Sequence, residues 1–400
     1  MQTNLAPRIQ KSPQAEAIGS ILRKCVHCGF CNATCPTYQL RGDELDGPRG
    51  RIYQMKQYFE GEPANVDMLR HLDRCLTCRA CETTCPSGVK YSHLLEIGKE
   101  MIETDLPRPL HDRLRRRAIV RFINSGWLFA SLLRVGQAVA AFMPAAIRQS
   151  IPARQKVLAR SKAQHERKVL MLAGCVQPTL APNTNIRAVN LLDRLGIEVI
   201  EPSGNLCCGA AAMHTSEPEY ALQQIKTLID RWWPHIEAGV EAIVVTATGC
   251  GVSVRDYGRL LADDPEYAEK AARVTALYRD LVEIVEDNLD QISIDDPAGR
   301  RVAVHTPCTM QHGLGLGNRG ERLLGNLGYR ICRVEEAHLC CGSAGTYSML
   351  QPAMSRRLQQ NKWRALGVDH PDVIVTSNIG CQVHLAQGGG TPVVHWIELL

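Results

Sequence analysis

The sequence predicts an α+β multidomain chain, in which a helical domain is followed by two copies of one doubly wound α/β domain. Two observations predict this class. The 17 cysteines fall into three blocks, at 25–85, 175–250 and 308–381, and each block contains a repeat or repeats its neighbour. Buried strands alternate with helices in the second and third blocks, which is typical of parallel sheets, whereas the first block lacks such strands. The 400 residues suit two or three domains rather than one.

The first block contains the run C-x2-C-x2-C-x3-C-P twice, with the copies 50 residues apart. This spacing is that of bacterial 4Fe–4S clusters, and in two-cluster ferredoxins the fourth cysteine binds the other cluster. We therefore assign one cluster to Cys25, Cys28, Cys31 and Cys85. The second cluster is assigned to Cys75, Cys78, Cys81 and Cys35. Two structural zinc sites are the alternative, but a compact run of four cysteines is poor geometry for one tetrahedron.

The segments around these cysteines predict helices at 17–24, 50–61 and 92–105, so residues 1–107 are expected to form a helical di-cluster domain. Domains are also expected at 166–295 and 296–400. Their buried strands are predicted at 168–175, 197–202, 241–250, 301–308, 329–336 and 372–381. Longer helices are expected at 217–237 and 349–366.

The second and third blocks repeat each other. A single cysteine is followed 32 positions later by Cys-Cys-Gly, and a last cysteine follows 42 or 40 positions after that pair. These residues come at strand ends, and α/β proteins place ligands at the carboxyl ends of their strands. The candidates for further cluster ligands are Cys175, Cys207, Cys208, Cys250, Cys308, Cys340, Cys341 and Cys381. Buried free thiols are the alternative, and Cys332, inside an apolar strand, is interpreted as a core residue.

The duplicated spacing resembles the cysteine-rich CCG domain of heterodisulfide reductases, of the third subunit of anaerobic glycerol-3-phosphate dehydrogenase and of lactate-utilisation proteins. Two ferredoxin motifs followed by two CCG domains account for nearly the whole chain. The stretches that most resemble the iron–sulfur subunits of bacterial glycolate oxidases are 25–56, 71–91, 338–347 and 378–386.

This resemblance implies an electron-transfer subunit of a glycolate (2-hydroxy acid) dehydrogenase. FAD-binding partner subunits would oxidise glycolate to glyoxylate, and this chain would pass the electrons through two 4Fe–4S clusters to an acceptor such as membrane quinone. The chain alone is expected to be inactive. The alternatives are a subunit of a lactate or glycerol-3-phosphate dehydrogenase, and a thiol/disulfide reductase like heterodisulfide reductase.

The full CCG pattern ends in C-x2-C, but this chain has Ser253 and His384 at the final positions. This departure argues against a five-thiolate cluster and against the reductase. A four-cysteine cluster remains compatible with the sequence. His384 is a candidate extra ligand, for which the alternative is a polar surface residue in a loop.

The sequence shows no glycine-rich nucleotide-binding turn with an acidic partner, because the glycines at 313–320 are interpreted as a loop, and it shows no P-loop. We therefore assign no catalytic residue and no flavin to this chain. Aromatic residues make up only 5%, which does not favour nucleic-acid binding. The first twenty residues have no apolar core typical of a secretory signal, so a reducing, cytoplasmic location is expected.

Residues 108–165 form a basic and apolar linker. Its apolar run at 127–147 is about long enough to span a bilayer, but Arg134, Gln137 and Pro144 interrupt it. We favour helices that dock the cluster domain onto the CCG domains. A helix lying on the cytoplasmic face of the inner membrane is the alternative.

Overall fold

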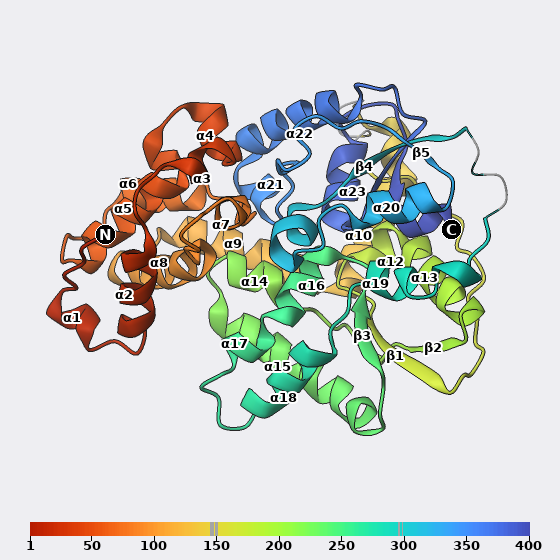
Figure 1. The fold of residues 1–400 in the computed structure, drawn as a ribbon, viewed down its shortest axis with the longest axis horizontal. Coiled ribbons are helices and arrows are strands. Elements are labelled where there is room, and N and C mark those ends of the chain that lie inside the picture. The colour runs from red at the N-terminus through yellow and green to blue at the C-terminus, as the bar shows by residue number, and fades with distance from the viewer. Residues whose placement is uncertain (145–147, 149–150, 295–296, 298) are drawn as a thin grey trace.

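The computed structural model describes residues 1–144, 148, 151–294, 297 and 299–400. It confirms the predicted class, because a helical N-terminal domain lies at one side of the molecule and two α/β domains lie together at the other (Figure 1). The expected boundary between the α/β domains, at 295–296, falls outside the described residues, as does the end of the run at 127–147.

Residues 1–107 form helices only, and the three expected helices correspond to α2, α5 and α8. Prolines begin α4 and α5, at the first helical position, where a backbone amide would have no hydrogen-bond partner within the helix. The helices enclose one apolar core that includes Leu22, Met55, Phe59 and Leu94. The elements are α1 (Pro7–Gln10), α2 (Ala15–Lys24), α3 (Phe30–Ala33), α4 (Pro36–Arg41), η1 (Glu44–Asp46), α5 (Pro48–Phe59), α6 (Val66–Asp73), α7 (Ala80–Thr83) and α8 (Tyr91–Asp105).

Each α/β domain has a parallel sheet built around its first strand. The first sheet has the order β2-β1-β3, with β1 at Arg167–Leu172, β2 at Ile197–Ile200 and β3 at Ala242–Val245. The second has the order β5-β4-β6-β7, with strands β4 (Arg301–His305), β5 (Arg330–Ile331), β6 (Val373–Thr376) and β7 (Val393–His395). The six predicted strands are present, although each is shorter than expected. Strand β7 was not predicted, because three residues after a glycine-rich turn are too short to show a pattern.

Helices cover both faces of the sheets, as the doubly wound class requires. The first domain contains α12 (Gln177–Leu180), α13 (Pro182–Arg194), α14 (Ala210–His214), α15 (Pro218–Glu237), α16 (Thr248–Arg255), α17 (Tyr257–Leu260), α18 (Ala268–Leu277), α19 (Leu281–Glu286) and η3 (Leu289–Gln291). The second contains the π-helix η4 (Thr309–Leu314), α20 (Arg319–Asn326), α21 (Tyr347–Leu350), α22 (Pro352–Leu366), α23 (Ile379–Ala386) and η5 (Trp396–Leu399). The glycine-rich segment at 313–320 is therefore a loop only between η4 and α20.

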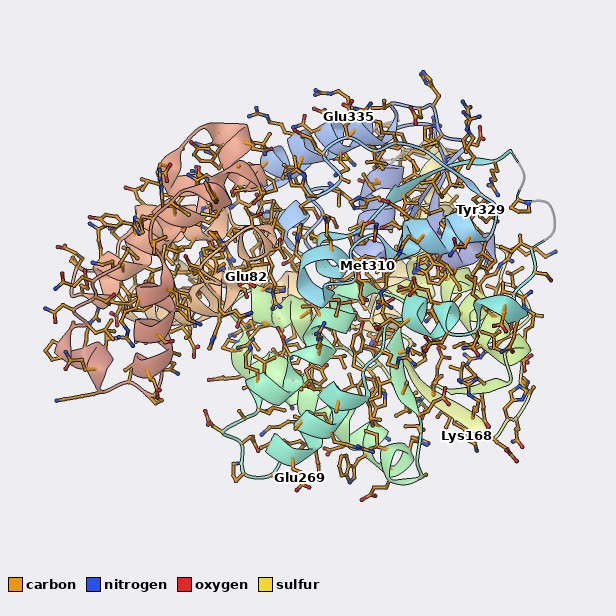
Figure 2. The ribbon with its side chains drawn as sticks, viewed as in Figure 1. Glu82, Lys168, Glu269, Met310, Tyr329 and Glu335 are labelled. Carbon is orange, nitrogen blue, oxygen red and sulfur yellow. The ribbon has the colours of Figure 1, made fainter. Side chains whose placement is uncertain are left out.

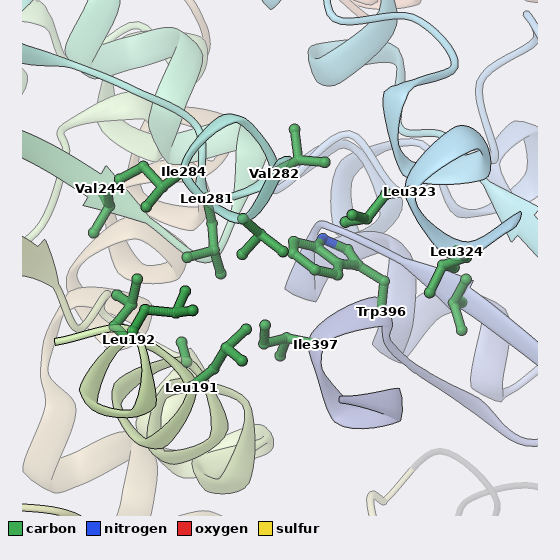
Figure 3. Close-up of a cluster of buried hydrophobic side chains, with 14 of the residues drawn as sticks. Leu191, Leu192, Val244, Leu281, Val282, Ile284, Leu323, Leu324, Trp396 and Ile397 are labelled. Carbon is green, nitrogen blue, oxygen red and sulfur yellow. The ribbon is translucent and has the colours of Figure 1, made fainter. Parts of the chain in front are cut away.

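The two α/β domains share one hydrophobic core (Figure 3). Val244 on the first sheet and Val375 on the second belong to it. Of the residues of η5, Ile397 lies beside Leu191 of α13 and Trp396 lies beside Leu323 of α20 (Figure 3). Alternate strand residues point to the opposite face, so that Leu170 packs with α15 and α18 instead. The repeats are therefore fused through buried apolar surface, and the C-terminal turn holds them together.

The linker forms α9 (Leu110–Asn124) and α10 (Gly126–Val139), followed by η2 (Ala140–Phe142). Helix α9 bridges the domains as expected. Its Arg116 binds Asp73 of the cluster domain at 3.0 Å, while Arg117 binds Glu217 and Arg115 donates to the carbonyl of Met349. Burial favours the neutral form of Asp73, but Lys99 and the neighbouring arginines outweigh it and hold the pKa of this carboxyl well below its usual range.

Helix α10 is different, because none of its residues is buried. Trp127 is 75% exposed and Phe142, just beyond its end, is 91% exposed. Within the described residues, no single helix has the length and apolar character to cross a membrane; α9 and α10 with η2 pass that test only together, across a bend of 88°.

Candidate metal centres

The first hollow in the helical domain is lined by thiols from both ferredoxin motifs. Cys25, Cys28, Cys31 and Cys85 line it. The fourth cysteine of the second motif thus joins the first three of the first motif, as the crossed assignment expects. Cys28 is exposed, so this hollow lies near the surface.

The second hollow is lined by Cys35, Cys75, Cys78 and Cys81. These are the four thiols assigned to the second cluster. Cys81 and Tyr91 line both hollows, so the two candidate centres are adjacent.

The loops of the two ferredoxin motifs bring their thiols together through residues with positive φ. In the first motif His27 and Gly29 have φ of 58° and 84°, and the matching residues of the second motif, Thr77 and Arg79, have φ of 52° and 61°. Left-handed backbone is uncommon for non-glycine residues and is concentrated at functional sites. The amide of Thr77 also donates to Sγ of Cys75 at 3.4 Å, and hydrogen bonds to the sulfurs are a common feature of iron–sulfur sites.

The chemistry of these hollows fits an iron–sulfur cluster. Burial raises the pKa of Cys31 to about 11, with a further contribution from Cys25, and burial raises the pKa of Cys78 well above its ordinary value. Without a cation these thiols would stay protonated at neutral pH. Iron would supply the positive charge that lets the four thiols assigned to each cluster bind as thiolates.

The α/β domains bring each predicted quartet into one chain of thiol contacts. In the first, Cys207 contacts Cys175 and Cys208, and Cys208 contacts Cys250. In the second, Sγ of Cys308 lies 3.8 Å from Sγ of Cys340, Cys340 contacts Cys341, and Cys341 contacts Cys381. We call these two quartets the first and second CCG sites.

The glycine of each Cys-Cys-Gly triplet is required by the backbone. Gly209 has φ of 81° and Gly342 has φ of 88°, and each begins the turn that follows its cysteine pair. A Cβ at Gly342 would lie 2.7 Å from the carbonyl oxygen of Ser355. Only glycine combines this conformation with this close approach, so the pair is held against the next helix.

The structure places the remaining residues as follows. Cys332 is buried in an apolar cluster with Leu366 and Ile374, in keeping with a core role. His384 is buried on helix α23, and its Nε2 lies 3.4 Å from Oγ of Ser355, so the interpretation as a polar surface loop residue is wrong. The cause is that α23 begins directly after the strand and turns this residue inward.

One residue near the second site was missed by sequence reasoning. A ring nitrogen of His305 and the Sγ atoms of Cys341 and Cys381 all lie within 4.8 Å of one another. Comparison of the repeats could have found it, because the position 133 residues earlier holds Leu172.

The second hollow lies against the second CCG site. Leu76 and Cys78 share a small hydrophobic cluster with Cys308 and Cys340. Figure 2 shows Glu82 and Met310 near this junction, and the neighbouring Thr83 and His312 are hydrogen-bonded at 2.8 Å. The helical domain and the second CCG domain are therefore in direct contact at their cysteines.

Comparisons with known proteins agree with this geometry. Residues 21–89 match the 4Fe-4S dicluster domain, and residues 169–255 and 302–386 each match the cysteine-rich CCG domain. The glycolate oxidase iron-sulfur subunit of Escherichia coli (strain K12) is 48% identical over all of this chain and 98% of its own length. The chain belongs to this family.

A second family member, the probable glycolate oxidase iron-sulfur subunit of Bacillus subtilis (strain 168), is 30% identical over 95% of this chain and 93% of its own length. Lactate utilization protein A of Exiguobacterium sp. is 27% identical and covers 58% of this chain. The family's dicluster and CCG domains support iron–sulfur binding and electron transfer by this chain.

Proposed function

We propose that this chain is the electron-transfer subunit of a glycolate dehydrogenase, which takes electrons from FAD-binding partner subunits as they oxidise glycolate to glyoxylate. The observation that carries the proposal is the pair of adjacent four-thiol hollows, one near the surface and one against the second CCG site. Full-length similarity to glycolate oxidase subunits favours glycolate over lactate, because the lactate relative covers little more than half the chain.

Electrons enter at the first hollow in this proposal. Cys28 is exposed there, and the flanking Val26 and Phe30 are 66% and 60% exposed. Exposed apolar side chains around a reactive centre are typical of a docking surface, here for a flavoprotein. Cys78 and Cys308 pack against the same buried cluster, which supports the second CCG site as the next carrier.

Membrane quinone as the final acceptor is part of the proposal. The exposed apolar side chains of α10 include Trp127, Leu132 and Val135, and arginines of α9 lie nearby in the chain. An apolar face beside a basic one supports attachment to the cytoplasmic face of the inner membrane.

The cluster content is the first prediction. Two 4Fe–4S clusters in the helical domain require about eight irons and eight sulfides per chain, with more if the CCG sites are filled. Iron and sulfide analysis with EPR on the anaerobically purified chain measures this. About four irons or fewer per intact chain would contradict the two-cluster assignment.

The second prediction tests the electron donor. Glycolate alone is expected to leave the clusters of the purified chain oxidised, because an iron–sulfur cluster cannot accept a hydride from carbon. Adding the FAD-binding subunits should let glycolate reduce the clusters. The reduction is measured as a loss of the clusters' visible absorbance. Lactate and glycerol 3-phosphate with the same subunits are the matched controls. Reduction by glycolate without flavoprotein, or stoichiometric FAD in this chain, would contradict the proposal.

A further inference from the structure

The two CCG domains differ at one pair of positions beside their thiols. In the first sheet, the last residues of β1 and β3, Leu172 and Val245, are paired across the ladder. In the second sheet the same pair is His305 and Thr376. One copy thus has two hydrocarbon side chains where the other has two polar ones, although both pairs lie at the carboxyl ends of parallel strands.

Each of these polar side chains has a buried atom without a hydrogen-bond partner among the described residues. His305 and Thr376 are each 2% exposed. Within the described part of the chain, Nε2 of His305 and Oγ1 of Thr376 have no hydrogen-bond partner. A buried polar atom left unpaired costs about 1–3 kcal/mol, so such atoms usually indicate a ligand or a water.

The surroundings of His305 indicate which ligand. Its ring nitrogen and the Sγ atoms of Cys341 and Cys381 lie within 4.8 Å of one another. Imidazole and thiolate together select iron, zinc or copper rather than magnesium or calcium.

A buried cation lies close to the same thiols. Lys362 is 3% exposed, and its Nζ donates to the carbonyl of Glu336 at 2.9 Å, near Cys341 and Cys340. The position 133 residues earlier holds Ile229, which is fully buried in apolar surroundings. A buried lysine is costly without a compensating negative charge, so the second site is suited to an anionic group, and the first site has no lysine at this position.

We propose that the iron–sulfur cluster of the second CCG site binds one of its irons through a ring nitrogen of His305, beside Cys341 and Cys381. The inference rests on the proposed function, which calls for a cluster there. Four thiols and a nitrogen exceed the four ligands of structural zinc, and the contact with Cys78 places the site next to an electron carrier.

The ligand sets then give the two CCG sites different potentials. Each iron of a cubane takes one protein ligand, so an iron bound by His305 leaves one of the four thiols unbound. A neutral imidazole in place of a thiolate raises the reduction potential, as in Rieske centres. The second site becomes the more strongly accepting of the two, which suits its place after the second hollow. The first site, with Leu172 at this position, has thiolate ligands only.

Pulsed EPR on the full chain tests this assignment. The protein is produced with ordinary and with 15N-labelled histidine, and the cluster signal that Cys381→Ser removes is examined. We expect a directly coordinated nitrogen whose coupling changes on histidine labelling. His305→Leu, which installs the residue of the first repeat, should abolish the coupling while the eight or so irons of the ferredoxin clusters remain.

His384→Ser is the matched control, because it installs Ser253 of the first repeat and should keep the coupling. Coupling that survives His305→Leu but disappears in His384→Ser would overturn the proposal in favour of the other histidine. A second-site cluster without nitrogen coupling, zinc in place of iron, or no cluster at that site would also overturn it. None of these results affects reduction of the ferredoxin clusters by glycolate and flavoprotein, so the failure of this inference is distinguishable from that of the proposed function.

Discussion

Replacing Cys78 by serine is expected to remove one 4Fe–4S cluster and to stop electron flow through the complex. Cys78 lines the second hollow and lies against Cys308 of the second CCG site, so it occupies the junction between the helical domain and that site. Serine is a poor substitute for a thiolate ligand of iron. Iron should fall by about four per chain, and glycolate turnover with quinone or dye downstream should fall to background.

Cys332→Ser is the matched control for Cys78→Ser. Cys332 is buried in a hydrophobic cluster that also includes Cys341 and Cys381, but it belongs to neither ferredoxin motif. The substitution should cost about 1–3 kcal/mol of stability while leaving the iron of the two ferredoxin clusters in place. Single-turnover experiments add a sharper readout. If electrons enter at the first hollow, flavoprotein and glycolate should still reduce the remaining cluster of the Cys78→Ser variant. A variant with full turnover would show that the second hollow is not on the electron path.

Sequence spacing was sufficient to predict the thiol groupings of the helical domain. The two motifs are identical in spacing and lie 50 residues apart, so the crossed sets follow from the chemistry of the cluster rather than from the fold. The quartets of the CCG domains followed from a similar argument, since strand ends of a parallel sheet meet at one edge. The residues of both groups lie together in the structure, although which groups hold clusters stays a prediction.

Other features depend on contacts that no local pattern encodes. The core shared by the two repeats is completed by Trp396, more than a hundred residues from most of its neighbours, and β7 is too short to show alternation. His305 lies in an apolar strand where a polar residue has no local signature. Its candidate role as a ligand becomes visible only in the folded structure, where β4 pairs with β6 and His305 lies close to Cys341 and Cys381.

Asp46→Ala is expected to lower the free energy of unfolding more than Cys332→Ser or Asp67→Ala. Asp46 is fully buried, and its carboxylate binds Arg74 at 2.9 Å and Nδ1 of His71 at 2.9 Å, with Arg51 also in range. Arg41 of α4 pairs with the same carboxylate at 2.5 Å. One side chain thus joins α4, α5 and α6 between the two ferredoxin motifs.

The cost comes from what the substitution leaves behind. Arg51 is 1% exposed, and without the carboxylate its buried charge would lose its carboxylate partner and keep hydrogen bonds to the neutral carbonyl of His71 and hydroxyl of Thr37. Removing one member of a buried ion pair typically costs about 3–5 kcal/mol. Arg74 immediately precedes Cys75, so the same loss should loosen the second hollow and release its iron first.

Urea titration under anaerobic conditions, followed by the visible absorbance of the clusters, measures this effect. Asp67→Ala is the matched control, because Asp67 pairs with Arg70 at the surface of the same domain, and such exposed pairs contribute at most about 1 kcal/mol. The Asp46→Ala variant should lose its clusters at markedly lower urea than the control. Equal urea midpoints for the two variants would mean that water or backbone groups compensate the buried charge of Arg51. The Asp46 carboxylate would then not be what stabilises the packing between the two ferredoxin motifs.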